Sequence, residues 1–249
     1  MSLARRLKGE RIVALDGFVS AEDCALMREE LNYAFWRPSA VHVRRANGAL
    51  EDRLSLARIS DSAHETWFSK PLRACVRRME RRIGERLGAP TDNFEPWQAT
   101  RYARHGRFDA HFDSGHWSAE PAGERQTTLL VYLTTPSRGG GTWFPRLNRE
   151  FAAKTGRLLI WDNLMETGET DREMLHAACP LTRGSKITLV TWVRERAVRT
   201  GATQPIASRP ADPERRRSAI RGARSGAELR SSRRGQMEES PQCQARLRS

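Results

Sequence analysis

Three residues in this sequence have the types and spacing of a metal-binding set, and a lysine follows them closely. His111 and Asp113 are separated by one residue, His176 comes 63 positions after Asp113, and Lys186 lies ten positions further on. Two neutral imidazoles and one carboxylate on one face of a metal are the ligands of non-heme Fe(II) oxygenases, which keep open positions for a chelating cosubstrate and O2. The lysine would supply a fixed positive charge for a dicarboxylate.

The H-x-D spacing has a simple geometric reading. Residues i and i+2 of a strand point to the same side, so His111 and Asp113 can reach one metal from one strand while Phe112 points to the opposite face. The third ligand must come from elsewhere, and His176 begins a strand-like stretch. Alone, the spacing is common by chance, and a surface His and Asp near a turn would look the same. The surrounding sequence decides between these readings.

Further motifs in a fixed order surround the metal-binding residues. They are the series Tyr102, Gly106, Phe108, His111 and Asp113, the segment from Arg125 to Leu133, the turn from Gly139 to Pro145, and the run from His176 to Leu181 followed by Gly184 and Lys186. In order and spacing they resemble the prolyl 4-hydroxylase branch of the 2-oxoglutarate- and Fe(II)-dependent oxygenases. The resemblance covers residues 93–196, is looser over 10–92 and stops at about residue 197.

The resemblance implies a role for each matched residue. His111, Asp113 and His176 would bind Fe(II), and Lys186 would pair with the far carboxylate of 2-oxoglutarate. Tyr102 would donate its hydroxyl to the same carboxylate, since a charge-assisted hydrogen bond is about twice as strong as a neutral one. Thr127 would add another hydroxyl, although a β-branched residue is equally expected in a strand. O2 would be the second cosubstrate, with ascorbate as a reductant.

The residues at the open end of the site are matched less closely. In family members that act on peptides, the positions of Arg125 and Trp192 lie near the mouth where the substrate enters, although Trp192 is equally compatible with an ordinary core position. His116 is either a substrate contact or a solvent-exposed loop histidine. Phe108 stands where many relatives carry Tyr, and the missing hydroxyl concerns substrate recognition rather than iron binding.

The reaction implied by the resemblance is hydroxylation of an unactivated C–H bond, with succinate and CO2 as co-products. The favoured substrate is a prolyl residue in a peptide or protein. A free amino acid, another small molecule or a nucleobase stays open as the substrate, because a fold does not determine what is bound. A non-catalytic, basic nucleic-acid-binding protein on the same scaffold is the alternative from another class, and it would bind without iron.

The sequence patterns predict an α+β protein with three regions. Residues 1–92 are predicted to be an N-terminal α/β support region, 93–196 a double-stranded β-helix (jelly-roll) barrel, and 197–249 a disordered Arg-rich tail. Short β-branched runs separated by turn sequences predict strands in the middle region, at 127–134, 158–162 and 187–193. A barrel of this kind can hold a metal site and a ligand pocket in its mouth, with the helices bracing one sheet.

Two helices and one strand are expected in the first region. Ser20 and Asp23 resemble a capping box that opens a helix through about Leu31. A second helix is expected to begin near Pro71 and to stop at Gly88, because apolar residues recur at helical spacing between them. Its other face carries five arginines, which either solvent or nucleic acid would contact. A short strand is expected at 12–15.

The C-terminal region is the most basic part of the chain. Residues 197–249 contain 12 Arg and 5 acidic residues and so carry +7 of the formal net charge of +13. They have few large apolar side chains, and too little burial to offset the entropy of ordering predicts disorder. The arginine runs at 215–217 and 233–234 would bind a nucleic acid or an acidic partner weakly, or the region is a tolerated extension.

The N-terminal sequence shows no apolar leader segment. No run in the chain approaches the roughly 20 apolar residues of a membrane span. We therefore expect a cytoplasmic enzyme that does not contact a membrane. The sequence determines neither the position that is hydroxylated nor the oligomeric state.

Overall fold

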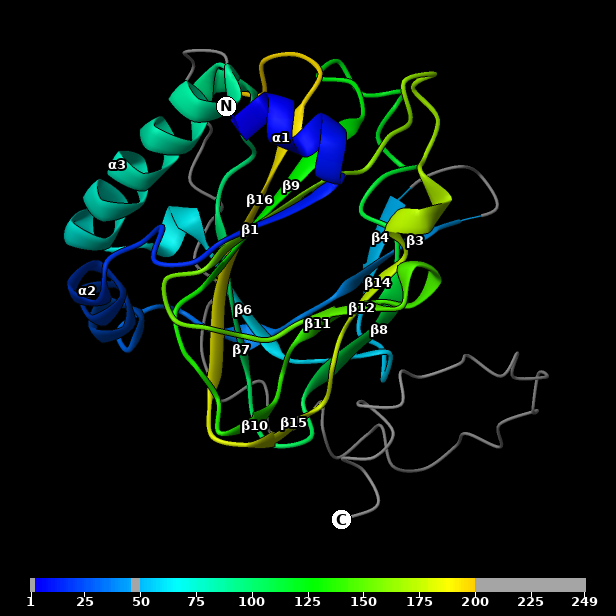
Figure 1. The fold of residues 1–249 in the computed structure, drawn as a ribbon. Coiled ribbons are helices and arrows are strands. Elements are labelled where there is room, and N and C mark those ends of the chain that lie inside the picture. The colour runs from blue at the N-terminus through cyan, green and yellow to red at the C-terminus, as the bar shows by residue number, and fades with distance from the viewer. Residues whose placement is uncertain (1–2, 46–49, 200–249) are drawn as a thin grey trace, which may run out of the picture. The chain divides into compact units, whose positions relative to one another are not determined.

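A computed structural model describes residues 3–45 and 50–199 (Figure 1). In this part of the chain, two antiparallel sheets face each other and three helices lie on the outer side of one sheet. The helices are α1 (Leu3–Glu10), α2 (Ala21–Leu31) and α3 (Lys70–Leu87). Four short 3-10 turns are η1 (Glu65–Trp67), η2 (Thr91–Asn93), η3 (Pro145–Leu147) and η4 (Arg172–Met174).

The larger sheet has seven strands in the order β1-β13-β9-β16-β7-β6-β2. All of its neighbouring strands are antiparallel. The strands, in chain order, are β1 (Ile12–Leu15), β2 (Arg37–Pro38), β6 (Asp61–His64), β7 (Gln98–Tyr102), β9 (Arg125–Tyr132), β13 (Leu158–Asp162) and β16 (Lys186–Arg194).

The smaller sheet has five antiparallel strands in the order β12-β11-β14-β8-β5. They are β5 (Arg58–Ile59), β8 (Arg107–His111), β11 (Thr142–Phe144), β12 (Arg149–Phe151) and β14 (His176–Ala178). Two further strand pairs complete the described part: β3 (Val41–Arg44) with β4 (Leu50–Arg53), and β10 (Arg138–Gly139) with β15 (Leu181–Arg183).

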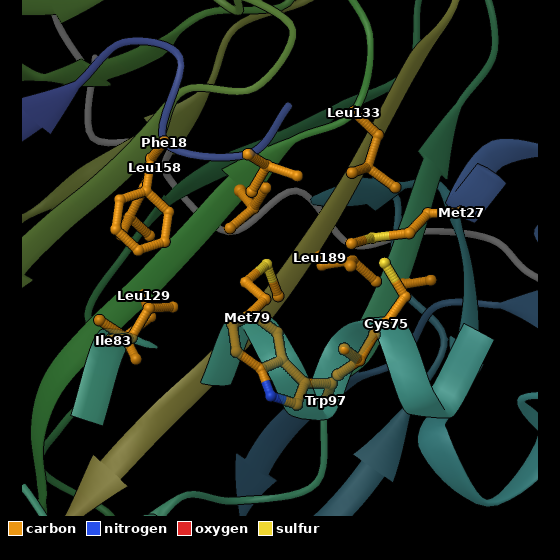
Figure 2. Close-up of a cluster of buried hydrophobic side chains, with 14 of the residues drawn as sticks. Phe18, Met27, Cys75, Met79, Ile83, Trp97, Leu129, Leu133, Leu158 and Leu189 are labelled. Carbon is orange, nitrogen blue, oxygen red and sulfur yellow. The ribbon is translucent and has the colours of Figure 1, made fainter. Parts of the chain in front are cut away.

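The two faces of the larger sheet pack against different parts of the protein, because successive side chains along each strand point to opposite faces. On β9, Leu129 and Val131 point to the helices, whereas Leu130 and Tyr132 point to the smaller sheet. Figure 2 shows the helix-side core, in which strand and helix side chains interdigitate, among them Phe18, Met27, Cys75, Met79, Ile83, Trp97, Leu129, Leu133, Leu158 and Leu189. Each such side chain stabilises the fold by about 1.5–3 kcal/mol when fully buried.

The helix boundaries follow the capping signals in the sequence. Ser20 accepts a hydrogen bond from the backbone N–H of Asp23 at the start of α2, as the capping-box prediction requires. At the start of α3, Ser69 accepts one from the backbone N–H of Leu72, and Gly88 ends the helix with φ of 73°, a left-handed conformation that glycine adopts without steric cost. No helix in residues 3–45 or 50–199 is long and apolar enough to cross a bilayer.

The strand predictions are close, and the regional boundaries differ more. The strand at 158–162 is confirmed, but β9 begins and ends two residues before the predicted 127–134. Strands from before residue 93 enter both sheets: β1, β2 and β6 join the larger one and β5 the smaller one. The N-terminal region therefore supplies strands of the same two sheets in addition to the bracing helices.

The predicted start of the disordered tail at residue 197 is wrong for its first three residues. The backbone N–H groups of Val198 and Arg199 both donate to the carbonyl of Asp92. The guanidinium of Arg199 binds the carboxylate of Glu80 through two hydrogen bonds of 2.6 and 2.9 Å. Two backbone hydrogen bonds and the Arg199 side chain thus hold these residues despite their polar composition. The rest of the predicted tail, 200–249, lies outside the described residues.

Glu80 of α3 is the centre of a charged cluster between this helix and the larger sheet. The residue is 1% exposed, and its carboxylate accepts hydrogen bonds from Arg77, from Arg199 and from the indole N–H of Trp97 at 2.7 Å. Neighbouring Glu65 accepts from Arg77 and from the backbone N–H of Trp97. Two buried carboxylates thus tie α3 to the strand β7 that follows Trp97 and to the end of the described chain.

Replacing Glu80 should therefore destabilise the protein strongly. Glu80→Ala leaves the indole N–H of Trp97 without an acceptor and Arg199 without its carboxylate, and we expect the free energy of unfolding to fall by about 3 kcal/mol, the lower end for breaking a buried ion pair. Glu85→Ala is the matched control, because Glu85 is an exposed residue of the same helix, and it should change stability by less than about 0.5 kcal/mol. Urea unfolding measures both; equal effects would contradict the role of the cluster.

Candidate metal centre and adjoining cleft

Strands β8 and β14 bring the two candidate histidine ligands together. His111, the last residue of β8, lies directly opposite His176, the first residue of β14. Asp113 comes after the end of β8, so it reaches the site from the following turn rather than from the strand on which the sequence placed it. One potential ligand atom from each of the three residues lies within 4.8 Å of the others. The structure therefore brings the predicted metal-binding set to one point.

Backbone carbonyls fix both imidazole rings. The Nδ1 atom of His111 lies 2.9 Å from the carbonyl oxygen of Asp109, and that of His176 lies 2.9 Å from the carbonyl oxygen of Met174. A carbonyl can only accept, so each Nδ1 must carry the proton. Each Nε2 then has a free lone pair, which is the arrangement of a metal-ligating histidine whose other nitrogen is held by a carbonyl.

The carboxylate of Asp113 is held by a hydroxyl and a side-chain amide in series. The Thr128 hydroxyl donates to Oδ2 of Asp113 at 2.8 Å, and the Asn163 amide nitrogen donates to the Thr128 hydroxyl at 2.8 Å. Neither Thr128 nor Asn163 was singled out in the sequence. Both are buried, so their polar atoms require partners inside the protein. Thr128 and Asn163 therefore orient the carboxylate toward the histidines.

The three donor groups fit a divalent cation. The Nε2 atoms of His111 and His176 lie 3.7 and 3.5 Å from the Asp113 carboxylate, too far for hydrogen bonds. Burial and the neighbouring His176 lower the pKa of His111 to about 3, which keeps its ring neutral. Burial raises the pKa of Asp113, but the two histidines, Arg125 and the hydrogen bond from Thr128 together lower it to about 2, so the carboxylate stays charged. Neutral imidazoles and a carboxylate are the protonation states that metal binding requires.

Lys186 lies beside this set in a small cavity between the two sheets. It is the first residue of β16 and is 2% exposed, and it lies directly opposite Tyr102 on the neighbouring strand β7. The cavity, of about 80 Å³, is also lined by all three candidate ligands. Burial lowers the pKa of Lys186 to about 7, against a raising effect of Glu150. A buried ammonium that forms no ion pair with any described residue favours an anionic ligand.

Tyr102 lies in the same small cavity as Lys186. Its side chain is buried, lines the same cavity, and its ring centroid lies 4.5 Å from Nζ of Lys186. Burial raises the pKa of its hydroxyl, which keeps it a donor. The hydroxyl forms no hydrogen bond with another described residue, so a ligand carboxylate next to Lys186 could accept one from it.

Thr127 does not line the cavity. Its hydroxyl donates to Oδ1 of Asp162 at 2.9 Å on the helix side of the sheet, because it has the same strand parity as Leu129. The adjacent Thr128, with the opposite parity, faces the cavity instead, as does Thr188 on β16. The sequence signal that was available is alternation: Leu129 reads as a core residue, which puts Thr127 on the core side and Thr128 on the side of the site.

A larger cleft of about 980 Å³ opens next to the metal-binding set. His111 and Asp113 line its inner end, and the strand pair β3 and β4 contributes His42 and Asp52 to its wall. His42 packs edge-on against Trp117 of the loop after β8, with ring centroids 5.1 Å apart. The cleft is thus bounded by segments from both halves of the described chain.

The three residues predicted to contact substrate all line this cleft. Arg125 is buried and forms two hydrogen bonds of 2.7 Å with the carboxylate of Glu95. Its guanidinium lies 3.5 Å from the ring centroid of Trp192, which lines both the cleft and the small cavity. His116 also borders the cleft. Three arginines that the sequence reading passed over, Arg37, Arg58 and Arg172, line it as well.

Loss of Asp113 should abolish metal binding without unfolding the protein. Changes in groups that only support metal ligands typically cost 10- to 100-fold in affinity, so we expect Asp113→Ala to weaken Co(II) binding by more than about 100-fold. Asp109→Ala is the matched control, because its carboxylate pairs with Arg107 and only its backbone carbonyl holds His111. Co(II) absorption titrations measure both. Tight binding by Asp113→Ala would contradict the site.

Comparison with known proteins finds similarity over the part of the chain that carries the candidate site. Residues 97–194 match the family model of the 2OG-Fe(II) oxygenase superfamily. Prolyl 4-hydroxylase subunit alpha-1 of Gallus gallus is 33% identical over 145 residues, which are 56% of this chain and 28% of that protein. The chain therefore spans less than a third of the length of this curated relative.

Solved structures of two prolyl hydroxylases are similar in fold. The viral collagen prolyl hydroxylase of Paramecium bursaria Chlorella virus-1, in its 2OG complex, aligns with a TM-score of 0.57 at 24% identity and covers 75% of this chain and 97% of that one. The prolyl hydroxylase of Trichoplax adhaerens, in complex with a hypoxia inducible factor peptide fragment, aligns with a TM-score of 0.53 at 17% identity and covers 78% and 88%.

The matched segment includes the strands that carry Tyr102, His111, His176 and Lys186, together with Asp113. The sequence match, the fold and the geometry of the candidate ligands therefore agree. Residues 97–194 are thus similar to the 2OG-Fe(II) oxygenase superfamily, and a prolyl 4-hydroxylase alpha subunit is similar over 145 residues.

Proposed function

We propose that the protein is an Fe(II)- and 2-oxoglutarate-dependent dioxygenase that hydroxylates a prolyl residue in a peptide or protein. One observation carries the proposal. The buried, uncompensated Lys186 and the three-residue metal-binding set line a single cavity. A dicarboxylate that reaches the metal with one end would place its other carboxylate near the lysine. Neither group alone would distinguish this chemistry from a structural metal site or a buried lysine.

The residues present fit the metal and the cosubstrate. His111, Asp113 and His176 would hold Fe(II), and Lys186 with Tyr102 would hold the far carboxylate of 2-oxoglutarate. When bound, the metal and cosubstrate supply the oxidising chemistry for C–H hydroxylation, which consumes O2 and releases succinate and CO2. The protein would orient the metal and the cosubstrate and exclude water from them, because aromatic and hydroxyl side chains of the two sheets surround the candidate ligands.

Packing around His176 supports this role. The Trp161 ring lies 4.8 Å and the Phe144 ring 5.6 Å from the imidazole, centroid to centroid. Both aromatic side chains are buried. They restrict rotation of the ligand ring and exclude water from its rear side, so that ligands could approach the metal from the cavity and the cleft.

The shape of the site supports a peptide substrate. The cavity beside Lys186 is small, whereas the cleft is about 980 Å³ and reaches the metal-binding residues. The wall of the cleft includes Trp192, an aromatic face against which a pyrrolidine ring can pack. The named relatives are prolyl hydroxylases, and one solved relative holds a peptide. An extended chain with a proline at the inner end of the cleft is consistent with these features.

Three narrower proposals extend this function. We infer that the two facing sheets form a jelly-roll barrel, consistent with their antiparallel strands and with the site between them. Ascorbate would serve as a reductant, as the resemblance implies. The arginine-rich segment after residue 199 would make weak contacts with nucleic acid or an acidic partner, supported only by its charge.

Succinate release tests the proposed function. The protein loaded with Fe(II) and supplied with 2-oxoglutarate and O2 should release succinate, and proline-containing peptides should stimulate the release more than free proline or proline-free peptides. Mass spectrometry of the peptide should show a gain of one oxygen atom. His176→Ala, which removes a ligand, should eliminate both signals. Stimulation by free proline alone would reject the peptide substrate, and the absence of any succinate would reject the enzyme class.

The depressed pKa of Lys186 predicts that cosubstrate affinity depends on pH. Above about pH 7 the empty pocket holds a neutral amine, which must take up a proton to pair with a carboxylate. The dissociation constant for 2-oxoglutarate should therefore rise by up to about tenfold per pH unit between pH 7 and 9. Anaerobic calorimetry of the metal-loaded protein measures this, and in buffers of different ionisation enthalpy it should also report proton uptake.

Lys186→Arg and Lys186→Ala separate the contributions of charge and shape. The guanidinium stays charged throughout this pH range, so Lys186→Arg should bind 2-oxoglutarate more weakly, because the group is larger and planar, but with little pH dependence. Lys186→Ala should lose about two or more decades of affinity at every pH while binding Co(II) normally. A wild-type affinity with the same pH slope in Lys186→Ala would place the carboxylate elsewhere.

A further inference from the structure

The charged residues that line the cleft are unequally partnered. Two acidic residues there pair with arginines and one faces the metal-binding site: Glu95 pairs with Arg125 and Arg194, Asp109 with Arg107, and Asp113 lies beside the two histidines. A fourth, Asp52, lies 2.8 Å from Nδ1 of His42. Arg37 and Arg58, by contrast, form no ion pair with any residue in the described ranges. These two arginines therefore present to the cleft positive charge that no ion pair in the described chain neutralises.

Arg58 is held in place by neutral groups alone. Its guanidinium donates to the carbonyl of Ala40 at 3.1 Å and lies within 3.4–3.5 Å of the hydroxyls of Ser60 and Ser62. It stacks over the Phe108 ring at 4.6 Å, and that ring stacks on the His111 imidazole at 3.6 Å. A single ring, that of Phe108, thus separates the guanidinium from a candidate metal ligand, and none of its contacts neutralises its charge.

The serines that hold Arg58 are themselves ordered. The Ser39 hydroxyl lies 2.5 Å from that of Ser62 and accepts a hydrogen bond from Ser60 at 2.8 Å. Ser39 is buried. Because these hydroxyls bond to one another, Arg58 is held in one position before any ligand arrives, and a preorganised cation loses less entropy on binding.

Arg37 lies on the same wall of the cleft. It is directly opposite Ser62 in the register of β2 and β6, and side chains of directly opposite residues lie on the same face of a sheet. Ser62 is the residue whose hydroxyl approaches Arg58. His64, two residues further along β6, also lines the cleft; burial lowers its pKa and the nearby charge of Arg37 lowers it further, against Glu65. Arg37 and Arg58 therefore flank Ser62 from two strands.

We propose that Arg37 and Arg58 form a subsite for the carboxylate side chain of an acidic residue in the peptide substrate, close to the residue that is hydroxylated. The inference rests on the proposed function and adds the sequence context of the target. Arg58 is half-buried and Arg37 is exposed, and neither is engaged by a carboxylate of the described chain, so a carboxylate that reaches them can form charge-assisted hydrogen bonds. Arginine suits this task because its planar fork matches a carboxylate.

The cosubstrate is a poorer candidate for the same arginines. Arg58 borders both the small cavity and the cleft, but Arg37 lines only the cleft. A ligand that contacts both must therefore lie in the cleft, where the peptide would lie, whereas the far carboxylate of 2-oxoglutarate has Lys186. Peptide carbonyl groups could accept from Arg58, but they would leave its charge uncompensated.

Peptide binding tests the subsite independently of turnover. Labelled peptides with one central proline and a single Glu, Gln or Lys, placed one to four residues to either side, are titrated by fluorescence anisotropy into the Co(II)- and 2-oxoglutarate-loaded protein. At least one Glu position should bind about tenfold to a hundredfold more tightly than its Gln counterpart. The Lys counterpart should bind more weakly than Gln. The preference should shrink in 0.5 M salt because the subsite is partly exposed.

Variants assign the preference to the two arginines. Arg37→Glu should reverse the order at the preferred position, so that the Lys peptide binds more tightly than the Glu peptide. Arg58→Gln should remove most of the Glu preference while the Gln peptide still binds. Arg183→Gln is the control for net charge, because Arg183 is exposed on β15 and does not line the cleft. It should leave the preference unchanged.

The outcomes distinguish this inference from the proposed function. Equal binding of Glu and Gln peptides at every position overturns the subsite, as does a preference that survives in both Arg37→Glu and Arg58→Gln. Failure of all peptides to bind overturns it too. Succinate release and peptide oxidation are scored separately, so a protein that hydroxylates Glu and Gln peptides equally keeps the proposed function and loses only the acidic subsite.

Discussion

The pairing of β14 with β8 is the constraint on which the site depends. It sets His176 opposite His111 and leaves Asp113 in the turn just beyond, so that three ligands from distant parts of the sequence meet. A slip of one residue would turn His176 to the other side of its sheet. Two backbone carbonyls add a second constraint on the imidazole rings. The carbonyl of Asp109 belongs to β8, the strand of His111, and that of Met174 belongs to η4, just before the strand of His176. Backbone geometry therefore determines both the position and the tautomer of the ligands.

Buried charges in this protein fall into two groups with different consequences. Glu80 and Glu95 are compensated by arginines and indole or backbone donors, and they join elements that must stay together. Lys186 is buried and Arg58 is half-buried beside the metal-binding set, and neither forms an ion pair with a carboxylate in the described chain. The first arrangement stabilises the fold. The second arrangement favours the binding of an anion, because the anion gains an electrostatic attraction that no protein carboxylate already satisfies. A cation in a cavity without an ion pair therefore indicates a ligand site, whereas a paired cation indicates a structural role.

Local signals in the sequence predicted local structure well and long-range packing poorly. The stop at Gly88 was predictable because one residue's backbone conformation determines it. The site of Lys186 was predictable because its spacing from the other motifs is specific. The resemblance points to Thr127 as a cosubstrate contact, whereas Thr128 lines the cavity; alternation from the core residue Leu129 indicates which of the two faces the site. No sequence motif pointed to Arg58. Its importance arises from its contacts with three separate segments and from the lack of an acidic residue paired with it, and neither can be read from the sequence.

Glu95 shows how the wall of the cleft is linked to the rest of the fold. Its carboxylate holds Arg125 against the ring of Trp192 and also binds Arg194, while its backbone carbonyl accepts hydrogen bonds from Thr191 and Arg199. Arg199 in turn binds Glu80 under α3. The face against which a substrate would lie is therefore held by the same network that fastens the last described residues to the helix side of the sheet. Because that network is buried and charged, its members cannot be replaced one at a time without leaving a charge unpaired. The position of the cleft wall should then be as fixed as the core beneath it, and differences in substrate choice must come from the residues outside the network, among them Arg37 and Arg58.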